Sequence, residues 1–347
     1  MSLHDTPPAR KPNRLGLYLP FILLVVAMLA WSVFWFWAKG ETARRMDLAV
    51  AGFKAAGYEI TWSRRTLGGY PFRMDIALTD ARVREPAGWM LEAPRLEGEA
   101  FMQSRGHWML AAPLGITFVR PVGGAVAVRG ELIRASLGAL DKRPPSFSFE
   151  GVKLTFTPAA GAQPFALAGA DRVEFHLRAG PDDEGGVFMT LKNGKAAAGG
   201  LLARIAGDKP VAVEWNSTLS KMSAFTGSDW PSAVRHWSAG GGQMTVRKAG
   251  FTAGDALVGA SAGKLAAGSD GRLTGVLDVT LRQAPRALAL MGEAGLIAPE
   301  NAQAAAVVVE ARQGGADTAR ATLNFEAGQT TLGPVAIAPA PRVYQGP

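Results

Sequence analysis

Residues 17–37 read LYLPFILLVVAMLAWSVFWFW, and this stretch decides how the rest of the chain is organised. It carries no charged side chain. At about 1.5 Å per residue a helix of this length extends about 31 Å, which matches the hydrocarbon core of a bilayer. Aromatic residues gather at its C-terminal end, and tryptophan rings favour the headgroup region. The stretch predicts a membrane-spanning helix, with the remaining chain held beside the membrane.

Three other interpretations of this stretch have less support. A buried core helix would carry a polar stripe, whereas this one has only Ser32 and Tyr18. A cleavable signal peptide has a shorter apolar region followed by small residues, whereas this one ends in WFWAKG, which favours a permanent signal anchor. Dimerisation through a G-x-x-x-G motif is unsupported, because Gly16 is the only glycine near the span.

The orientation of the anchor rests on segment lengths rather than on charge. The basic residues before the span are Arg10, Lys11 and Arg14, and those after it are Lys39, Arg44 and Arg45. The positive-inside rule therefore gives a tie. The short, proline-rich tail predicts a cytoplasmic stub, and the long remainder predicts a translocated domain.

These features divide the chain into four parts. We predict a cytoplasmic tail (1–14), a transmembrane anchor (15–38), a juxtamembrane helix (39–57) and a β-rich translocated domain (58–347). If the last part has two lobes, we expect the break near 225–240.

The composition limits the class of protein. Hydrophobic residues make up 48% of the chain, which excludes a disordered protein. The 42 glycines and 22 prolines, with only 19% charged residues, predict many turns and short strands. The net charge is +8, but the basic residues are scattered singly, so we expect no nucleic-acid partner. Cysteine is absent, which excludes disulfides, thiolate nucleophiles and cysteine metal sites.

The hydrophobic period changes from helical to alternating after the anchor. Residues 41–58 have apolar residues at helical spacing and an i,i+4 pair of Glu41 and Arg45, which predicts a helix packed on the first strands. From Phe72 to Leu78, apolar and polar residues alternate, which predicts a strand with one buried face. The same alternation recurs along the chain, for example in 147–156, 173–177, 187–191, 211–215 and 322–326. Few helical patterns intervene, so we predict an extended antiparallel sheet.

Helical patterns return only in the second half of the chain. Asp229, followed by Pro231, predicts a capped helix that ends near His236. Two more helices are predicted from Pro285 and from Pro299, although Val307–Val309 could equally begin a strand. The fold class that we predict is mainly β (α+β): a transmembrane helix, a large, mostly antiparallel sheet body, and a few helices in the C-terminal third.

No set of reactive side chains converges in the sequence. Residues 259–263 match G-x-S-x-G, but every histidine precedes Ser261, whereas histidine follows the serine in α/β-hydrolases. The histidines outside the tail lie far apart and lack metal-binding spacing. A cluster of Glu92, Glu97 and Glu99 fits a solvated strand edge. We therefore expect no enzyme activity, no cofactor and no metal site.

A turn motif, Gly68-Gly69-Tyr70-Pro71-Phe72-Arg73, stands just before the first long strand. The paired glycines permit a tight turn, and Pro71 fixes φ at its entry. The block from Trp62 to Arg73, LEAPRLEGEA from Leu91 and LGPVAIAPAPRV from Leu332 together resemble the bacterial domain of unknown function 2125 family. The resemblance implies a single-pass protein of the bacterial inner membrane with its bulk in the periplasm, and it brings no catalytic residues.

The pattern is also similar, more remotely, to AsmA-type envelope proteins. That likeness implies a long, curved sheet whose apolar concave face holds lipid chains. A sheet with one apolar face needs a cover, from helices, from a second sheet or from outside the chain.

Two hypotheses for function follow from this need for a cover. The first is a non-catalytic protein that binds or transfers membrane lipid in an apolar β-groove. Its candidate lining residues are Phe72, Met74, Ile76, Leu114, Ile116 and Phe118. The alternative is a structural scaffold that binds another envelope protein and has no groove. An open apolar groove would favour the first hypothesis, and a closed, dry core would favour the second.

Overall fold

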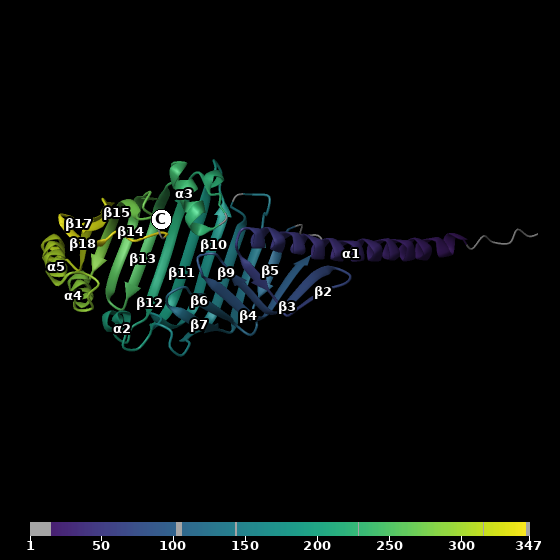
Figure 1. The fold of residues 1–347 in the computed structure, drawn as a ribbon, viewed down its shortest axis with the longest axis horizontal. Coiled ribbons are helices and arrows are strands. Elements are labelled where there is room, and N and C mark those ends of the chain that lie inside the picture. Colours follow the sequence, from purple (N-terminus) through teal and green to yellow (C-terminus); the bar gives the residue numbers. More distant parts are fainter. Residues whose placement is uncertain (1–14, 102–105, 143, 228, 315, 345–347) are drawn as a thin grey trace, which may run out of the picture.

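The computed structural model describes residues 15–101, 106–142, 144–227, 229–314 and 316–344 (Figure 1). A long helix, α1 (Leu15–Ala55), leads into a single antiparallel sheet. The molecule is elongated: α1 projects from one end, and the last two helices stand at the other. Within the described residues, α1 is the one helix long and apolar enough to cross a membrane.

The remaining elements are short helices and many strands. The strands are β1 (Glu59–Thr61), β2 (Arg64–Gly68), β3 (Arg73–Arg84), β4 (Met90–Phe101), β5 (Trp108–Ala111), β6 (Ile116–Arg120), β7 (Gly124–Arg129), β8 (Leu132–Gly138), β9 (Ser146–Pro158), β10 (Leu167–Ala179), β11 (Gly185–Ala196), β12 (Val211–Leu219), β13 (Met244–Ala253), β14 (Ala256–Ala267), β15 (Leu273–Arg282), β16 (Thr318–Glu326), β17 (Gln329–Leu332) and β18 (Val335–Pro339). The helices after α1 are α2 (Leu201–Ala206), the 3-10 helix η1 (Met222–Ala224), α3 (Trp230–Ala239), α4 (Ala284–Glu293) and α5 (Pro299–Gln313).

The sheet runs without interruption from one end of the body to the other. Strands β1 and β2 both pair with β3, and β3 pairs with β4. Strand β4 then pairs with both β5 and β6; β5 continues to β8, β6 continues to β7, and β8 and β7 both pair with β9. From β9 to β18 each strand pairs with the next one in sequence. Every pairing is antiparallel, which confirms the predicted fold class.

The sheet curves so that strands distant in its order come close together. Asp229 caps α3, which follows β12, whereas Glu85 directly follows β3. Burial raises the pKa of the Glu85 carboxyl, and the negative charge of Asp229 raises it further. The charge of Asp229 therefore acts on Glu85 although several strands separate the two in the sheet order. Strand β12 pairs directly with β13, so the sheet continues across residues 225–240, the place at which two lobes, if present, were expected to divide.

Helix α1 joins the predicted anchor and the predicted juxtamembrane helix in one unbroken element. Beyond the uncharged stretch, Glu41 forms ion pairs of 2.7 Å with both Arg44 and Arg45. Farther along, Asp47 pairs with Arg65 of β2 at 2.6 Å, which ties the helix to the sheet. The helix therefore continues from the apolar stretch along the first strands.

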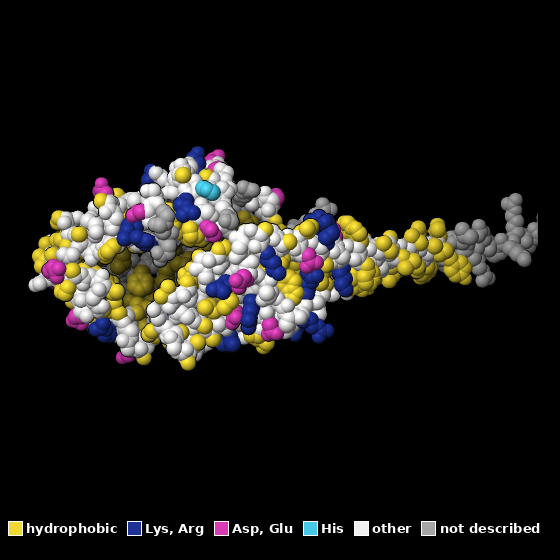
Figure 2. All heavy atoms as spheres, in the orientation of Figure 1, with side chains coloured by type: hydrophobic (Ala, Val, Ile, Leu, Met, Phe, Trp, Pro, Cys, Tyr) yellow, Lys and Arg dark blue, Asp and Glu magenta, His cyan; other side chains and the backbone are white. Residues whose placement is uncertain are grey.

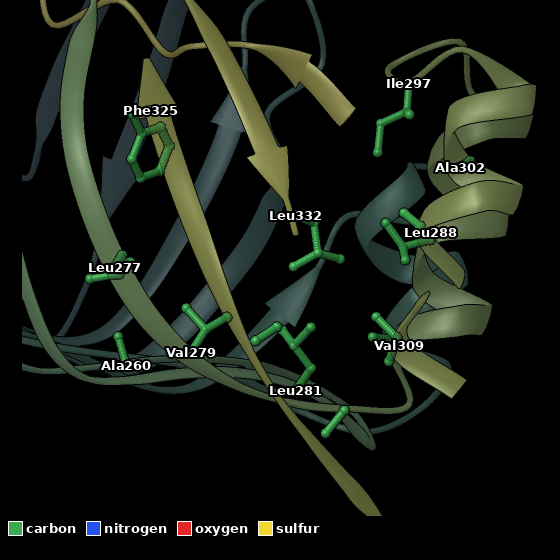
Figure 3. Close-up of a cluster of buried hydrophobic side chains, with 14 of the residues drawn as sticks. Ala260, Leu277, Val279, Leu281, Leu288, Ile297, Ala302, Val309, Phe325 and Leu332 are labelled. Carbon is green, nitrogen blue, oxygen red and sulfur yellow. The ribbon is translucent and has the colours of Figure 1, made fainter. Parts of the chain in front are cut away.

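The largest buried cluster lies where α4 and α5 cover the last strands. Helix α5 includes Val307–Val309, so this segment is helical and does not begin a strand. Ala305 and Val309 of the helix are fully buried. Figure 3 shows Leu288 of α4 and Val309 of α5 facing Leu332 and Leu281 of the sheet. Both predicted C-terminal helices are confirmed, and they close this end of the sheet.

Asp229 caps helix α3, as the sequence predicts, and the structure adds Ser232 as its partner in a capping box. The Asp229 carboxylate accepts a 2.7 Å hydrogen bond from the backbone N–H of Ser232. In return, the backbone N–H of Asp229 donates a 3.2 Å hydrogen bond to the Ser232 hydroxyl. Hydrogen bonds from Ser232 hold the pKa of Asp229 below its usual value. We expect Asp229→Ala to lower the free energy of unfolding by about 1 kcal/mol at neutral pH.

The cap should also make stability depend on pH. Because the folded pKa of Asp229 is depressed, its contribution is complete above the unfolded value, about pH 4, and is lost as the pH falls through the folded pKa. Thermal unfolding of the chain in detergent micelles, at neutral and at acid pH, measures this difference. Asp229→Asn keeps a hydrogen-bond acceptor at the cap but has no charge. The difference in unfolding temperature between this variant and the wild type should therefore shrink in acid. An equal effect of Asp229→Ala at both pH values would contradict this account.

Candidate apolar groove

One face of the sheet carries an unbroken row of non-polar residues. Paired residues of antiparallel strands project to the same face, so the register pairs trace the row from β3 to β16. The row consists of Ile76, Gly98, Leu110, Ala135, Phe149, Phe175, Met189, Trp215, Ala249, Ala260, Val279 and Ala321. An apolar surface therefore runs along the body, across the strands.

The rows on either side of this one are apolar as well. From β10 onward, one row contains Val173, Leu191, Val213, Phe251, Val258, Leu281 and Ala319. The other contains Leu177, Val187, Ser217, Val246, Gly263, Leu277 and Leu323. Its one polar member, Ser217, is 1% exposed and accepts a 2.9 Å hydrogen bond from the indole N–H of Trp215. The indole N–H of Trp215 is therefore paired, and the hydroxyl that it bonds is buried.

The opposite face of the same strands is polar. The matching row there contains Ala77, Glu97, Ala111, Arg134, Glu150, Glu174, Thr190 and Glu214. Glu150 forms ion pairs with Arg134 and with Arg172, each at 2.5 Å. The two faces of these strands thus differ sharply in chemistry.

Helices cover only part of the apolar face. At the far end, Ala260, Val279 and Ala321 are buried beneath α4 and α5. At one rim, Val234 and Trp237 of α3 pack on Ala267 and Tyr344.

Between these helices the apolar face is open. Phe175, Met189 and Trp215 are only half-buried, and Phe251 and Val258 are 40% and 39% exposed. Figure 2 shows a hollow with hydrophobic side chains on its floor, in the region where Figure 1 draws β12 and β13. A cavity of about 170 Å³ extends this surface beneath α4 toward Leu288 and Leu332. We call the open surface around Phe175, Met189 and Trp215 the apolar groove.

Four of the six predicted lining residues lie on strands near the start of the sheet. Met74 is 3% exposed, and Ile76 is the first residue of the central row, the apolar row that runs from Ile76 to Ala321. Ile116 packs against the cluster of buried residues around Val128. Phe118 stacks on Trp89 with ring centroids 5.1 Å apart.

The other two predicted residues stand apart from these four. Leu114 is 55% exposed between β5 and β6, and Phe72 is 63% exposed in the turn between β2 and β3. The six residues therefore do not form one site. The open part of the groove is made instead by the alternating segments 173–177, 187–191 and 211–215, which the sequence marks as strands without showing that their apolar faces stay uncovered.

The turn motif contacts α1. The indole N–H groups of Trp31 and Trp35 donate to the backbone oxygens of Pro71 and Arg73, at 2.8 and 2.9 Å. Gly69 has a φ of +96°, and a Cβ there would lie 2.7 Å from the Arg73 oxygen, so the turn requires glycine. The sequence predicts the turn correctly but gives no sign of its helix partner.

The structure bears on two of the sequence features considered for chemistry, the G-x-S-x-G match and metal ligands. Ser261 lies inside strand β14, whereas the nucleophile of an α/β-hydrolase stands on a strand-to-helix turn. Among those residues, no group of three His, Asp or Glu side chains is arranged to hold a metal ion.

Comparison with known proteins gives one result. The family model described as "Uncharacterized protein conserved in bacteria (DUF2125)" matches residues 35–341, from the C-terminal part of the apolar stretch to the last strands. Neither the curated proteins nor the solved structures include a match to this chain.

Proposed function

The chain belongs to the DUF2125 family, and we propose that it is a non-catalytic, membrane-anchored protein of the bacterial envelope that binds lipid acyl chains in the apolar groove. In this proposal α1 crosses the inner membrane once and the sheet stands in the periplasm. The acyl chain lies across the strands, over Phe175, Met189 and Trp215.

The uncovered apolar row carries this proposal. Apolar surface left in water costs about 25 cal/mol per Å², and soluble monomers rarely leave long contiguous apolar surfaces open. An acyl chain gains about 0.8 kcal/mol for each methylene that it buries, and it needs no hydrogen-bond partner. Within the groove, the indole N–H of Trp215 already donates to Ser217, which is itself buried, so the indole is not free to bind a polar ligand group. This chemistry selects hydrocarbon rather than a polar headgroup or a peptide backbone.

Two further observations favour a lipid over a protein scaffold partner. The apolar face is open, whereas a scaffold was expected to have a closed, dry core. Its open residues also lie on strands other than β1 and β2, which α1 contacts, so α1 does not cover them. Helix α1 is long and apolar enough to cross a membrane, and in the proposal it keeps the groove near a supply of lipid. Capping by α4 and α5 closes the far end, so a chain would rest in the middle of the sheet.

Photo-crosslinking in a membrane tests the proposal directly. The full chain is reconstituted with phospholipid that carries a diazirine near the end of one acyl chain, irradiated and digested, and the adducts are mapped by mass spectrometry. We expect adducts on β10, β11 and β12 at the apolar face, in addition to those on α1. Phospholipid with the diazirine on its headgroup is the control and should label the groove much less. Adducts confined to α1 and the adjacent β2–β3 turn would contradict groove binding.

A further inference from the structure

The turn between β2 and β3 is fastened to the apolar stretch of α1. In addition to the bonds from Trp31 and Trp35, the Ser32 hydroxyl and the Tyr70 hydroxyl form a 2.8 Å hydrogen bond. The Tyr70 ring packs edge-on against Trp35, at 5.4 Å between centroids. Trp35 is 2% exposed and is the one buried side chain among residues 18–37. The turn is therefore held at a fixed height on the helix.

The turn contacts α1 before the C-terminal end of the uncharged stretch, inside the segment that would span the membrane. Trp31 precedes Trp37, the last residue of the stretch, by more than one helical turn, about 9 Å along the axis. Lys39 is the first charged residue after the stretch, and its ammonium lies 5.7 Å from the centre of the Trp35 ring. If the uncharged stretch spans the bilayer, the groups bonded to Trp31 and Ser32 lie at membrane depth.

Three backbone oxygens of the turn, those of Gly69, Pro71 and Arg73, have hydrogen-bond partners. Unpaired backbone groups are costly inside a bilayer. Here the oxygens of Pro71 and Arg73 accept from the two indoles, and the Gly69 oxygen accepts a 2.9 Å hydrogen bond from the Arg73 N–H. Three polar groups of the apolar stretch, on Trp31, Ser32 and Trp35, thus pair with the turn.

The side chains that this arrangement leaves outside are aromatic. Tyr70 is 49% exposed and Phe72 is 63% exposed. Phe101, which pairs with Arg73 across β3 and β4, is 50% exposed. Charged groups begin just beyond, where the Arg73 guanidinium lies 3.3 Å from Glu99. The aromatic side chains thus lie at the end of the turn and the charged ones farther along the sheet. Side chains at a membrane interface follow the same order, with aromatic residues on the lipid side of charged ones.

We infer that the β2–β3 turn, with Tyr70 and Phe72 at its tip and Phe101 beside it, is a second membrane-inserted element that enters the leaflet next to α1. The partner of this surface is the lipid bilayer, because the turn is continuous with the apolar helix. Two inserted elements fix the tilt and rotation of the sheet, so the apolar row, which begins at Ile76 on β3, starts close to the membrane. The inference rests on the proposed membrane anchoring of α1, and it is independent of lipid binding in the groove.

Spin labelling tests this inference, since the chain has no cysteine and each introduced cysteine is unique. Single variants Phe72→Cys, Leu24→Cys and Val122→Cys carry a nitroxide in the full chain, reconstituted in phosphatidylethanolamine and phosphatidylglycerol liposomes. Leu24 lies in the apolar stretch, and Val122 is an exposed apolar residue (84%) in the β6–β7 turn. None of these side chains makes a hydrogen bond, and all three are exposed, so the variants should fold.

The readout is the collision of each label with oxygen, which enters lipid, and with a water-soluble nickel chelate. We expect the labels at 24 and 72 to lose collisions with the chelate and to gain collisions with oxygen, while the label at 122 collides freely with the chelate. If the label at 72 behaves like that at 122 while the label at 24 is protected, the turn lies in water and the inference is wrong, although the anchor stands. If the label at 24 also collides freely with the chelate, both the anchor and the inserted turn are overturned. Neither result bears on acyl-chain binding in the groove, which the crosslinking experiment measures separately.

Discussion

Met189→Asp is expected to abolish acyl-chain binding while the sheet stays folded. Met189 stands between Phe175 and Trp215 in the central row and is half-buried, so a carboxylate there remains hydrated while the groove is empty. A bound acyl chain would remove that water and leave the charge without a partner, at a cost of several kcal/mol. Since each 1.4 kcal/mol is about tenfold in affinity, we expect a loss of roughly a hundredfold or more. The yield of acyl-chain crosslinks on β10–β12 measures the loss.

The neighbouring residue supplies a matched control. Phe188 is also half-buried on β11, but it projects to the polar face, where it stacks against His176 at 6.0 Å. Phe188→Asp places the same charge one residue away on the other side of the same strand, so it should leave the crosslink yield near the wild-type value. Circular dichroism spectra of both variants check that the sheet is intact. Equal crosslink yields from both variants would show that the apolar face does not hold the chain.

Local patterns predict most of the elements because their causes are local. Alternation between Phe72 and Leu78 marks a strand because successive side chains of a strand point to opposite faces. Asp229 marks the start of a helix because its carboxylate satisfies a free N–H within the same turn. Such signals depend on neighbours a few residues away, so the sequence alone is enough to read them.

The groove could not be located in the same way because openness is a property of the whole sheet. The alternation at Phe175 or Met189 looks the same whether or not a helix covers the apolar face. Covering depends on where α4 and α5 dock, and they dock at the far end of the sheet. Phe72, one of the six predicted lining residues, lies between Pro71 and Arg73, whose backbone oxygens bond to α1. In the sequence, Trp31 is indistinguishable from any tryptophan at a membrane interface. The structure shows that its indole N–H donates a hydrogen bond to the backbone oxygen of Pro71.

Val309→Asp is expected to detach the helical cap at the far end of the sheet. Val309 is fully buried between α5 and the strands, in the cluster that contains Leu281, Leu288 and Leu332. A carboxylate placed there has no partner, and burying such a charge costs about 3–5 kcal/mol, a large share of the stability of a domain. We expect a lower unfolding temperature and faster amide hydrogen exchange in α4 and α5.

Val307, on the same helix, separates the effect of burial from the effect of charge. Its side chain is 59% exposed, so Val307→Asp adds the same carboxylate to the same helix without burying it, and stability should change by less than about 0.5 kcal/mol. If the two variants lose stability equally, the helix propensity of aspartate rather than the packed interface would explain the result. If only Val309→Asp loosens α4 and α5 while β10 to β12 keep their slow exchange, the cap is a separate cooperative unit. The open groove then derives its stability from the sheet itself, and the helices serve to end it.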